Sequence, residues 1–126
     1  MRSRLPDALR KLLRVIDSDF DPFVPDVCDY ELRRELIRAG LSRSERRLDE
    51  MVAYFGMVTT TAEVWRQAAG LWAEARKAGR ADRKALDADV ILAAEATAHN
   101  ATVLTMDPGD IGSLVGPGRV IDWMDV

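Results

Sequence analysis

Apolar residues in this chain fall into two kinds of stretch, one with helical spacing and one made of short β-branched runs. The clearest helical stretch covers residues 87–99, which are rich in Ala, Val, Ile and Leu and contain neither Gly nor Pro. Asn100 suits the left-handed residue that ends such a helix. The run 101–105 is mostly apolar and β-branched, and Pro108 and Gly109 stop it, as expected of a buried strand. A helix that leads into a buried strand is half of a βαβ unit, so the pattern predicts an α/β fold with a parallel sheet.

The same pattern predicts the remaining elements. Helices are expected over residues 5–16, 26–39, 43–55 and 60–78, and short strands over residues 22–25, 57–60 and 119–123. Capping boxes are predicted where Ser42 precedes Glu45 and where Thr60 precedes Glu63.

The longest predicted helix carries large aromatic and small side chains on one face. These are Trp65, Ala68, Ala69, Trp72 and Ala75. Small Ala side chains allow another element to approach closely, so we expect the tryptophans to fill core space. Stacking of the tryptophans on nucleic-acid bases is the alternative.

The length of 126 residues predicts one domain, and the composition is that of a soluble globular protein. No apolar run approaches the roughly 18 residues that a membrane span needs, and the charged N-terminal segment has no secretory hydrophobic core. Cys28 is the only cysteine and cannot form an internal disulfide, which favours a cytoplasmic location. The single histidine, His99, argues against ribonuclease chemistry based on a pair of histidines. A net charge of −3 excludes a generic DNA coat.

Acidic residues stand where an α/β fold would bring them to one sheet edge. Glu31 lies on a predicted helix, Asp89 opens another, and Asp107 and Asp110 follow a predicted strand. Ligand sites of parallel α/β sheets lie off the carboxyl ends of the strands. Carboxylates are the ligands that Mg²⁺ and Mn²⁺ prefer, so the set predicts a site that activates water for phosphodiester cleavage. The structural alternative is helix capping for Asp89 and an exposed, salt-bridged helix for Glu31.

A basic segment precedes the helix that Asp89 opens. Its cations are Arg76, Lys77, Arg80, Arg83 and Lys84. They are candidates for contacts with an RNA backbone beside the metal site. The alternative is a solvated helix end, where cations also complement the helix dipole.

Three segments in order resemble the PIN-domain family, which includes the VapC-type toxin ribonucleases. They are V-P-D-V-C-D-Y-E-L-R-R-E-L (24–36), L-D-A-D-V-I-L-A-A-E-A (86–96) and A-T-V-L-T-M-D-P-G-D (101–110). The resemblance implies a three-layer α/β/α domain and metal-dependent endonucleolytic cleavage of RNA. It places Glu31, Asp89 and Asp107 among the metal-binding acids, with Asp110 next to them. It also implies Mg²⁺ or Mn²⁺ as cofactor, RNA as substrate, a homodimer and an antitoxin partner.

The chain departs from that family at its start. Similar PIN domains begin with an apolar strand that supplies the first metal-binding Asp and the centre of the sheet, and no such strand precedes Leu5. Asp17 is an alternative source of that acid. The simpler interpretation is a chain shortened at its N-terminus, whose remaining strands must close together, borrow a segment from a partner or carry a gap.

Three functions therefore stay open at this stage. The first is a metal-dependent endoribonuclease, with activity impaired if the first acid is missing. The second is a catalytically inactive PIN relic that binds RNA or a protein. The third is a helix-turn-helix DNA reader built from residues 26–39 and 43–55, which the negative net charge and the lack of a basic recognition face disfavour.

Overall fold

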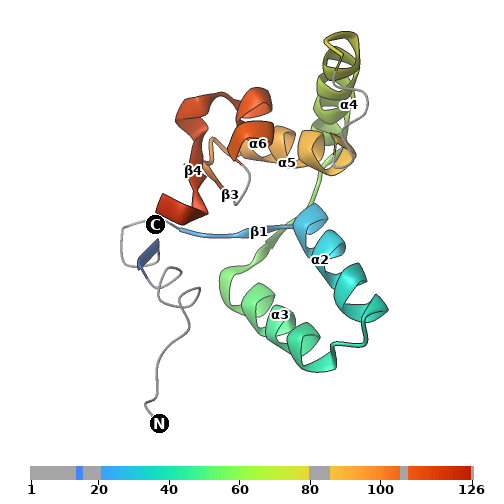
Figure 1. Ribbon diagram of the computed structural model, residues 1–126, viewed down its shortest axis with the longest axis vertical. Coiled ribbons are helices and arrows are strands. Elements are labelled where there is room, and N and C mark those ends of the chain that lie inside the picture. Colours follow the sequence, from blue (N-terminus) through green and yellow to red (C-terminus); the bar gives the residue numbers. More distant parts are fainter. Residues whose placement is uncertain (1–13, 16–20, 80–85, 106–107, 126) are drawn as a thin grey trace.

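The computed structural model describes residues 14–15, 21–79, 86–105 and 108–125 (Figure 1). Its main elements, in chain order, are β1 (Val24–Pro25), α2 (Asp26–Arg38), α3 (Ser42–Phe55), β2 (Met57–Val58), α4 (Ala62–Lys77), α5 (Leu86–Ala98), β3 (Val103–Thr105), α6 (Pro108–Val115) and β4 (Val120–Asp122). These helices and short parallel strands confirm the predicted α/β class. The predicted helix over residues 5–16, apart from residues 14 and 15, and the alternative acid Asp17 lie outside the described residues.

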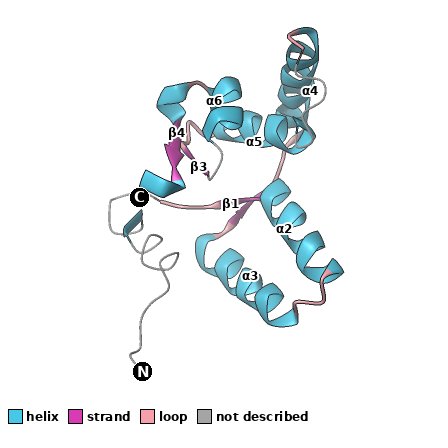
Figure 2. Cartoon of the chain, viewed as in Figure 1, coloured by secondary structure: helices cyan, strands magenta, loops and turns pink. Residues whose placement is uncertain are grey.

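The strands pair in parallel, but the described strands form two separate sheets of two strands each (Figure 2). Val24 of β1 lies opposite Met57 of β2. Val103 and Thr105 of β3 lie opposite Val120 and Asp122 of β4. The four described strands therefore do not close together into one sheet, which was one of the three outcomes considered for a shortened chain.

The core of the described structure surrounds α5. Figure 1 shows α4 crossing one end of α5, while α6 and the β3–β4 sheet lie along its other end. Ala93 and Ala94 of α5 are almost completely buried. Ala68 and Ala75 of α4 are buried against α5, so the small side chains do allow the two helices to pack closely.

The helices α2 and α3 form a pair on the other side of β1 from α5 (Figure 1). No residue of α2 is fully buried, and Leu48 is the only fully buried residue of α3. A charged hydrogen bond joins the two helices instead: Arg33 of α2 donates to Asp49 of α3 at 2.7 Å. Arg33 also donates to Asp29 of its own helix at 2.9 Å. These hydrogen bonds raise the pKa of Arg33.

Residues that tolerate a positive φ end two of the helices. Asn100 has φ 51°, so it is the left-handed residue predicted at the end of α5. Gly56 has φ 86° and separates α3 from β2.

Both predicted capping boxes are wrong. The residue before α3 is Leu41, which makes no side-chain cap, and Ser42 is already helical. Thr61 caps α4, because its side chain accepts a hydrogen bond from the backbone N–H of Val64. Thr60 lies one residue earlier and is buried.

The prediction that the tryptophans of α4 fill the core is also wrong. Trp65 is 53% exposed and Trp72 is 38% exposed, and Ala69 is exposed too. The inward face of α4 consists of Val64, Ala68, Leu71 and Ala75, which pack on α5, and the two indole rings lie outside this face.

No helix in the described part of the chain is both long enough and apolar enough to cross a bilayer.

Candidate functional site

Glu31 lies in the middle of α2, and its half-buried side chain faces a pocket of about 560 Å³. Asp26 from the start of α2 and Asp87 from the start of α5 line the same pocket. Arg34 approaches Glu31, with Nη2 4.0 Å from Oε2. The pocket therefore brings carboxylates of two helices to one side of the molecule.

Asp89 stands in the first turn of α5 and is half-buried. The helix dipole favours a carboxylate at this position. The thiol of Cys28 on α2 is influenced by the charges of both Asp89 and Glu31. Burial, and after it the charges of Glu31, Asp26, Asp89 and Glu95, raise the pKa of Cys28 from 9.0 to about 11. Glu31 and Asp89, 58 positions apart, thus act on the same small region of the structure.

A buried polar group lies next to this region and was missed by the sequence analysis. The hydroxyl of Thr60 is 2.6 Å from Oδ1 of Asp26 and 2.9 Å from Oε2 of Glu95. The backbone N–H of Thr60 donates to Oδ2 of Asp26 at 2.8 Å. This group joins α2, the segment before α4, and α5, and it shares Asp26 with the pocket.

Glu95 is completely buried, and its Oε1 has no hydrogen-bond partner among the described residues. Nε2 of His99 lies 3.7 Å from that oxygen. The signal for Glu95 was present in the sequence, because it is an acid inside the apolar run V-I-L-A-A-E-A. Buried polar groups are usually hydrogen-bonded, and the partner of the Glu95 carboxylate here is Thr60.

The remaining predicted acids divide between the described and undescribed parts of the chain. Asp110 is exposed in the first turn of α6. Asp107 lies outside the described residues. The structure therefore gives the positions of Glu31, Asp89 and Asp110, and the roles of all four acids stay predictions.

Carboxylate oxygens suit a hard divalent cation in kind. Within the described residues, no three His, Cys, Asp or Glu side chains come close enough together to hold an ion. Mg²⁺ is usually bound by only one or two protein carboxylates, with water and substrate phosphate completing its shell. Glu31 and Asp89 carry the kind of side chain that such a site uses.

Two of the five predicted RNA-contacting cations lie in the described structure. Arg76 and Lys77 form the exposed last turn of α4, and the guanidinium of Arg76 lies 4.7 Å from the ring centroid of Trp72. Arg80, Arg83 and Lys84 lie outside the described residues.

Comparison with known proteins gives one match. A family model described as PIN domain matches residues 2–109 of the chain. Neither the curated proteins nor the solved structures contain a match. The matched range includes Glu31, Asp89 and Asp107, and it ends one residue before Asp110.

Proposed function

This chain belongs to the PIN-domain family, and from that premise we propose that it is a metal-dependent endoribonuclease. Its nuclease-like fold carries the site, in which Glu31, Asp89 and Asp107 hold Mg²⁺ or Mn²⁺ with Asp110 beside them. The observation that supports this most directly is that α2, which carries Glu31, packs against α5, which carries Asp89.

A divalent cation bound by these carboxylates supplies an activated water and offsets the charge that develops on a phosphodiester. Glu31 and Asp89 would provide oxygen ligands, and Nη2 of Arg34 lies 4.0 Å from Oε2 of Glu31. The hydroxyl of Thr60 hydrogen-bonds to Asp26 and to Glu95, which links α2 to α5. Arg76 and Lys77, with the basic segment that follows them, attract the phosphate backbone of the RNA.

The proposal extends to a VapC-like role, in which a homodimer acts as a toxin and an antitoxin protein restrains it. The family resemblance supports this role.

A second function, RNA binding without cleavage, is favoured by one feature of α4. Trp65 and Trp72 are exposed, and Arg76 lies over the ring of Trp72. Exposed aromatic rings beside cations provide stacking surfaces for unpaired bases. This function needs no metal.

The test is cleavage of an end-labelled single-stranded RNA by the full chain with Mn²⁺, with Mg²⁺ and with EDTA. Glu31→Gln and Asp89→Asn should each lower the cleavage rate by at least about 10- to 100-fold, since the loss of even indirect metal partners often costs that much. Glu35→Gln is the matched control, because Glu35 lies one turn further along α2 and pairs with Arg38 at 2.9 Å.

Cleavage that continues in EDTA, or that survives both substitutions, shows that the assigned site is wrong. RNA binding that ignores EDTA and is never followed by cleavage supports the second function. Loss of that binding in Trp72→Ala would then locate it on α4.

A further inference from the structure

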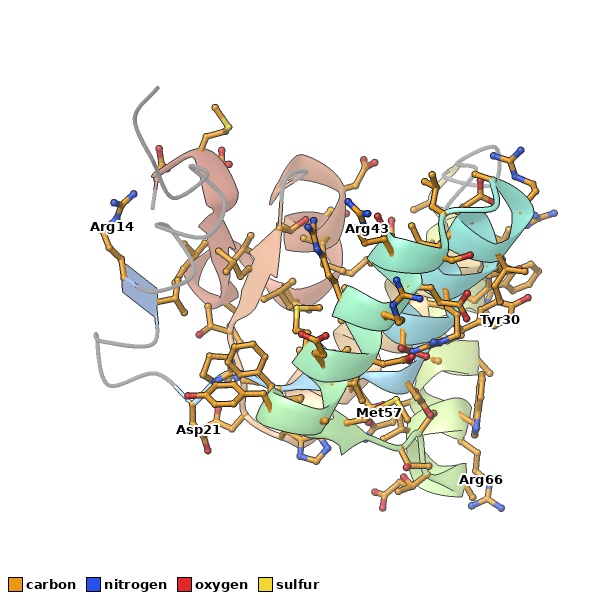
Figure 3. All side chains as sticks on the ribbon, turned by 90° about the horizontal axis from the view of Figure 1, so that it is seen from below. Arg14, Asp21, Tyr30, Arg43, Met57 and Arg66 are labelled. Atoms are coloured by element: carbon orange, nitrogen blue, oxygen red, sulfur yellow. The ribbon has the colours of Figure 1, made fainter. Side chains whose placement is uncertain are left out.

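The pocket that Glu31 faces has aromatic side chains in its lining as well as carboxylates. The rings are those of Tyr30 from α2 and Trp65 from α4. Tyr30 is 60% exposed and Trp65 is 53% exposed. Figure 3 shows Tyr30 and Arg66, the neighbour of Trp65 on α4, at the same end of the molecule. Two separate helices therefore bring exposed rings to the pocket of a proposed metal ligand.

The rest of the pocket suits a small, flat group. Apolar side chains from α2 and α5 complete its lining, namely the half-buried Val27, Ala88 and Ile91. Its volume of about 560 Å³ lies within the range of about 300–1,000 Å³ that is usual for small-molecule pockets. Such pockets combine apolar walls with a few polar groups that orient the ligand. In an RNA, the part with this character is an unpaired nucleobase.

Trp65 provides the face on which a base can stack. The ring of Tyr30 is covered by a cation, because Cζ of Arg34 lies 5.1 Å from its centroid. Among the described residues, neither a cation nor another ring covers Trp65. Stacking on an aromatic side chain typically changes the affinity for a single-stranded nucleic acid by roughly 5- to 150-fold.

One carboxylate of the pocket is placed to read the edge of the base. Both oxygens of Asp26 are already hydrogen-bonded to Thr60, and Glu31 is a proposed metal ligand. Asp87 is exposed in the first turn of α5 and lines the same pocket. An ionised carboxylate only accepts hydrogen bonds, so Asp87 selects a base that offers donors.

Guanine is the base whose edges match these side chains. Its N1–H and N2–H₂ groups are adjacent donors, whereas adenine, cytosine and uracil each offer one donor group at that edge. Its O6 and N7 atoms are the acceptors that arginine binds most often in base recognition. Arg34 lines the same pocket as Asp87. Asp87 and Arg34 therefore complement the donor edge and the acceptor edge of guanine.

We propose that this pocket binds an unpaired guanine of the RNA, with Trp65 stacked on the base, Asp87 accepting from N1–H and N2–H₂, and Arg34 donating to O6 and N7. The assignment rests on the proposed ribonuclease function and adds the base that the substrate carries beside the cleaved phosphodiester. The substrate is single-stranded, because the donor edge of guanine is paired in a duplex.

The test compares four labelled RNA octamers with the full chain. They are octauridine and the three octamers in which guanosine, adenosine or cytidine replaces the fourth uridine. Binding is measured by fluorescence anisotropy in EDTA, so that metal-dependent cleavage does not interfere. All four carry the same backbone charge, so differences in Kd report the base. We expect the guanosine octamer to bind at least about tenfold more tightly than the other three.

Two variants assign the preference to this pocket. Trp65→Leu should weaken binding of the guanosine octamer by at least about fivefold. Asp87→Asn should remove the preference for guanosine, because an amide has a donor beside its acceptor. The matched controls are Tyr54→Leu and Glu50→Gln, exposed residues of α3 that do not line the pocket. Urea denaturation verifies that each variant folds.

Equal binding of the four octamers, or a guanosine preference that survives Asp87→Asn, would overturn the proposal. A loss of binding in Tyr54→Leu as large as that in Trp65→Leu would also overturn it. Cleavage with Mn²⁺ separates this result from the proposed function. Cleavage that Glu31→Gln abolishes but that shows no preference for guanosine leaves the ribonuclease standing and rejects the guanine pocket. A guanosine preference in EDTA without cleavage in Mn²⁺ supports the pocket and rejects the ribonuclease.

Discussion

At the residue scale, Thr60 is the side chain that joins the buried Glu95 to Asp26. Its hydroxyl lies between Asp26 and Glu95, and its backbone N–H also holds Asp26. Thr60→Val keeps the shape and removes the hydroxyl, so Glu95 loses its donor. We expect the free energy of unfolding to fall by about 1–3 kcal/mol, the usual cost of leaving a buried polar group unsatisfied. Urea denaturation measures the change.

Two controls separate the hydroxyl from the shape of the side chain. Thr60→Ser keeps the hydroxyl and should remain closer in stability to the parent chain. Thr59→Val makes the same replacement at an exposed neighbour and should change stability little. If Thr60→Val is as stable as Thr59→Val, the hydroxyl is not holding the two carboxylates.

Cys28 gives a prediction about pH. Burial and four nearby carboxylates raise the pKa of its thiol from 9.0 to about 11. Between these values the unfolded chain releases the thiol proton and the folded chain keeps it. The free energy of unfolding therefore falls as pH rises from 9 toward 11. Denaturation of the parent chain and of Cys28→Ala over this range measures the difference, and the decline should be steeper in the parent.

The same shift makes the thiol unreactive. Two pKa units reduce the thiolate fraction at neutral pH by about 100-fold. Alkylation of the folded chain by iodoacetamide should therefore be at least this much slower than alkylation in urea. Equal rates in the two states would show that neither burial nor the carboxylates act on Cys28.

The N-terminal cap of α4 shows a feature that residue spacing alone does not predict. Thr60 and Thr61 are adjacent hydroxyl residues, and either one can precede a helix with Glu63 in its first turn. Thr61 is the cap, because Thr60 is hydrogen-bonded to Asp26 and Glu95, which lie 34 and 35 positions away in the sequence. No local pattern contains that information.

At the scale of elements, α4 and α5 are held together by alanines. Ala68 is 3% exposed and faces the core that α5 forms, while Ala69 on the next position is exposed. Ala68→Leu should therefore force the helices apart and lower the free energy of unfolding by about 1–3 kcal/mol. Ala69→Leu is the matched control, because the same change on the exposed side should be nearly neutral. Thermal denaturation of the two variants measures the contrast.

The helices and strands themselves were largely predictable. The helix predicted over residues 87–99 is α5, one residue earlier at each end, because its apolar density and the left-handed Asn100 are local signals. The direction that a helix faces was harder to predict. Alanines and tryptophans of α4 share a stripe in the sequence, yet close packing on α5 selects the alanines and leaves Trp65 exposed.

At the scale of the whole molecule, the proposed metal site joins α2 to α5. An ion that binds only the folded chain adds about 2.7 kcal/mol of stability at 100 times its dissociation constant. We therefore expect Mn²⁺ to raise the Tm of the parent chain by several degrees and to have little effect on Glu31→Gln or Asp89→Asn. Thermal denaturation with and without EDTA measures this, and equal shifts in all three proteins would contradict the assignment.

The candidate site was only partly predictable at this scale. Glu31 and Asp89 were identified as acids that a parallel fold could bring together, and the helices that carry them do pack against each other. Glu95 and Asp26 were missed, because their importance comes from burial against Thr60. The two separate sheets depend on how distant segments assemble, which hydrophobic spacing does not specify.

Among the described strands, β1 and β3 each pair with one other strand, and this arrangement also affects how long the chain survives. A strand edge without a partner is a template on which identical chains can stack, and such stacking grows into fibrils. An opening between two weakly joined halves also gives proteases access to the backbone. The chain should therefore persist longest where its concentration stays low.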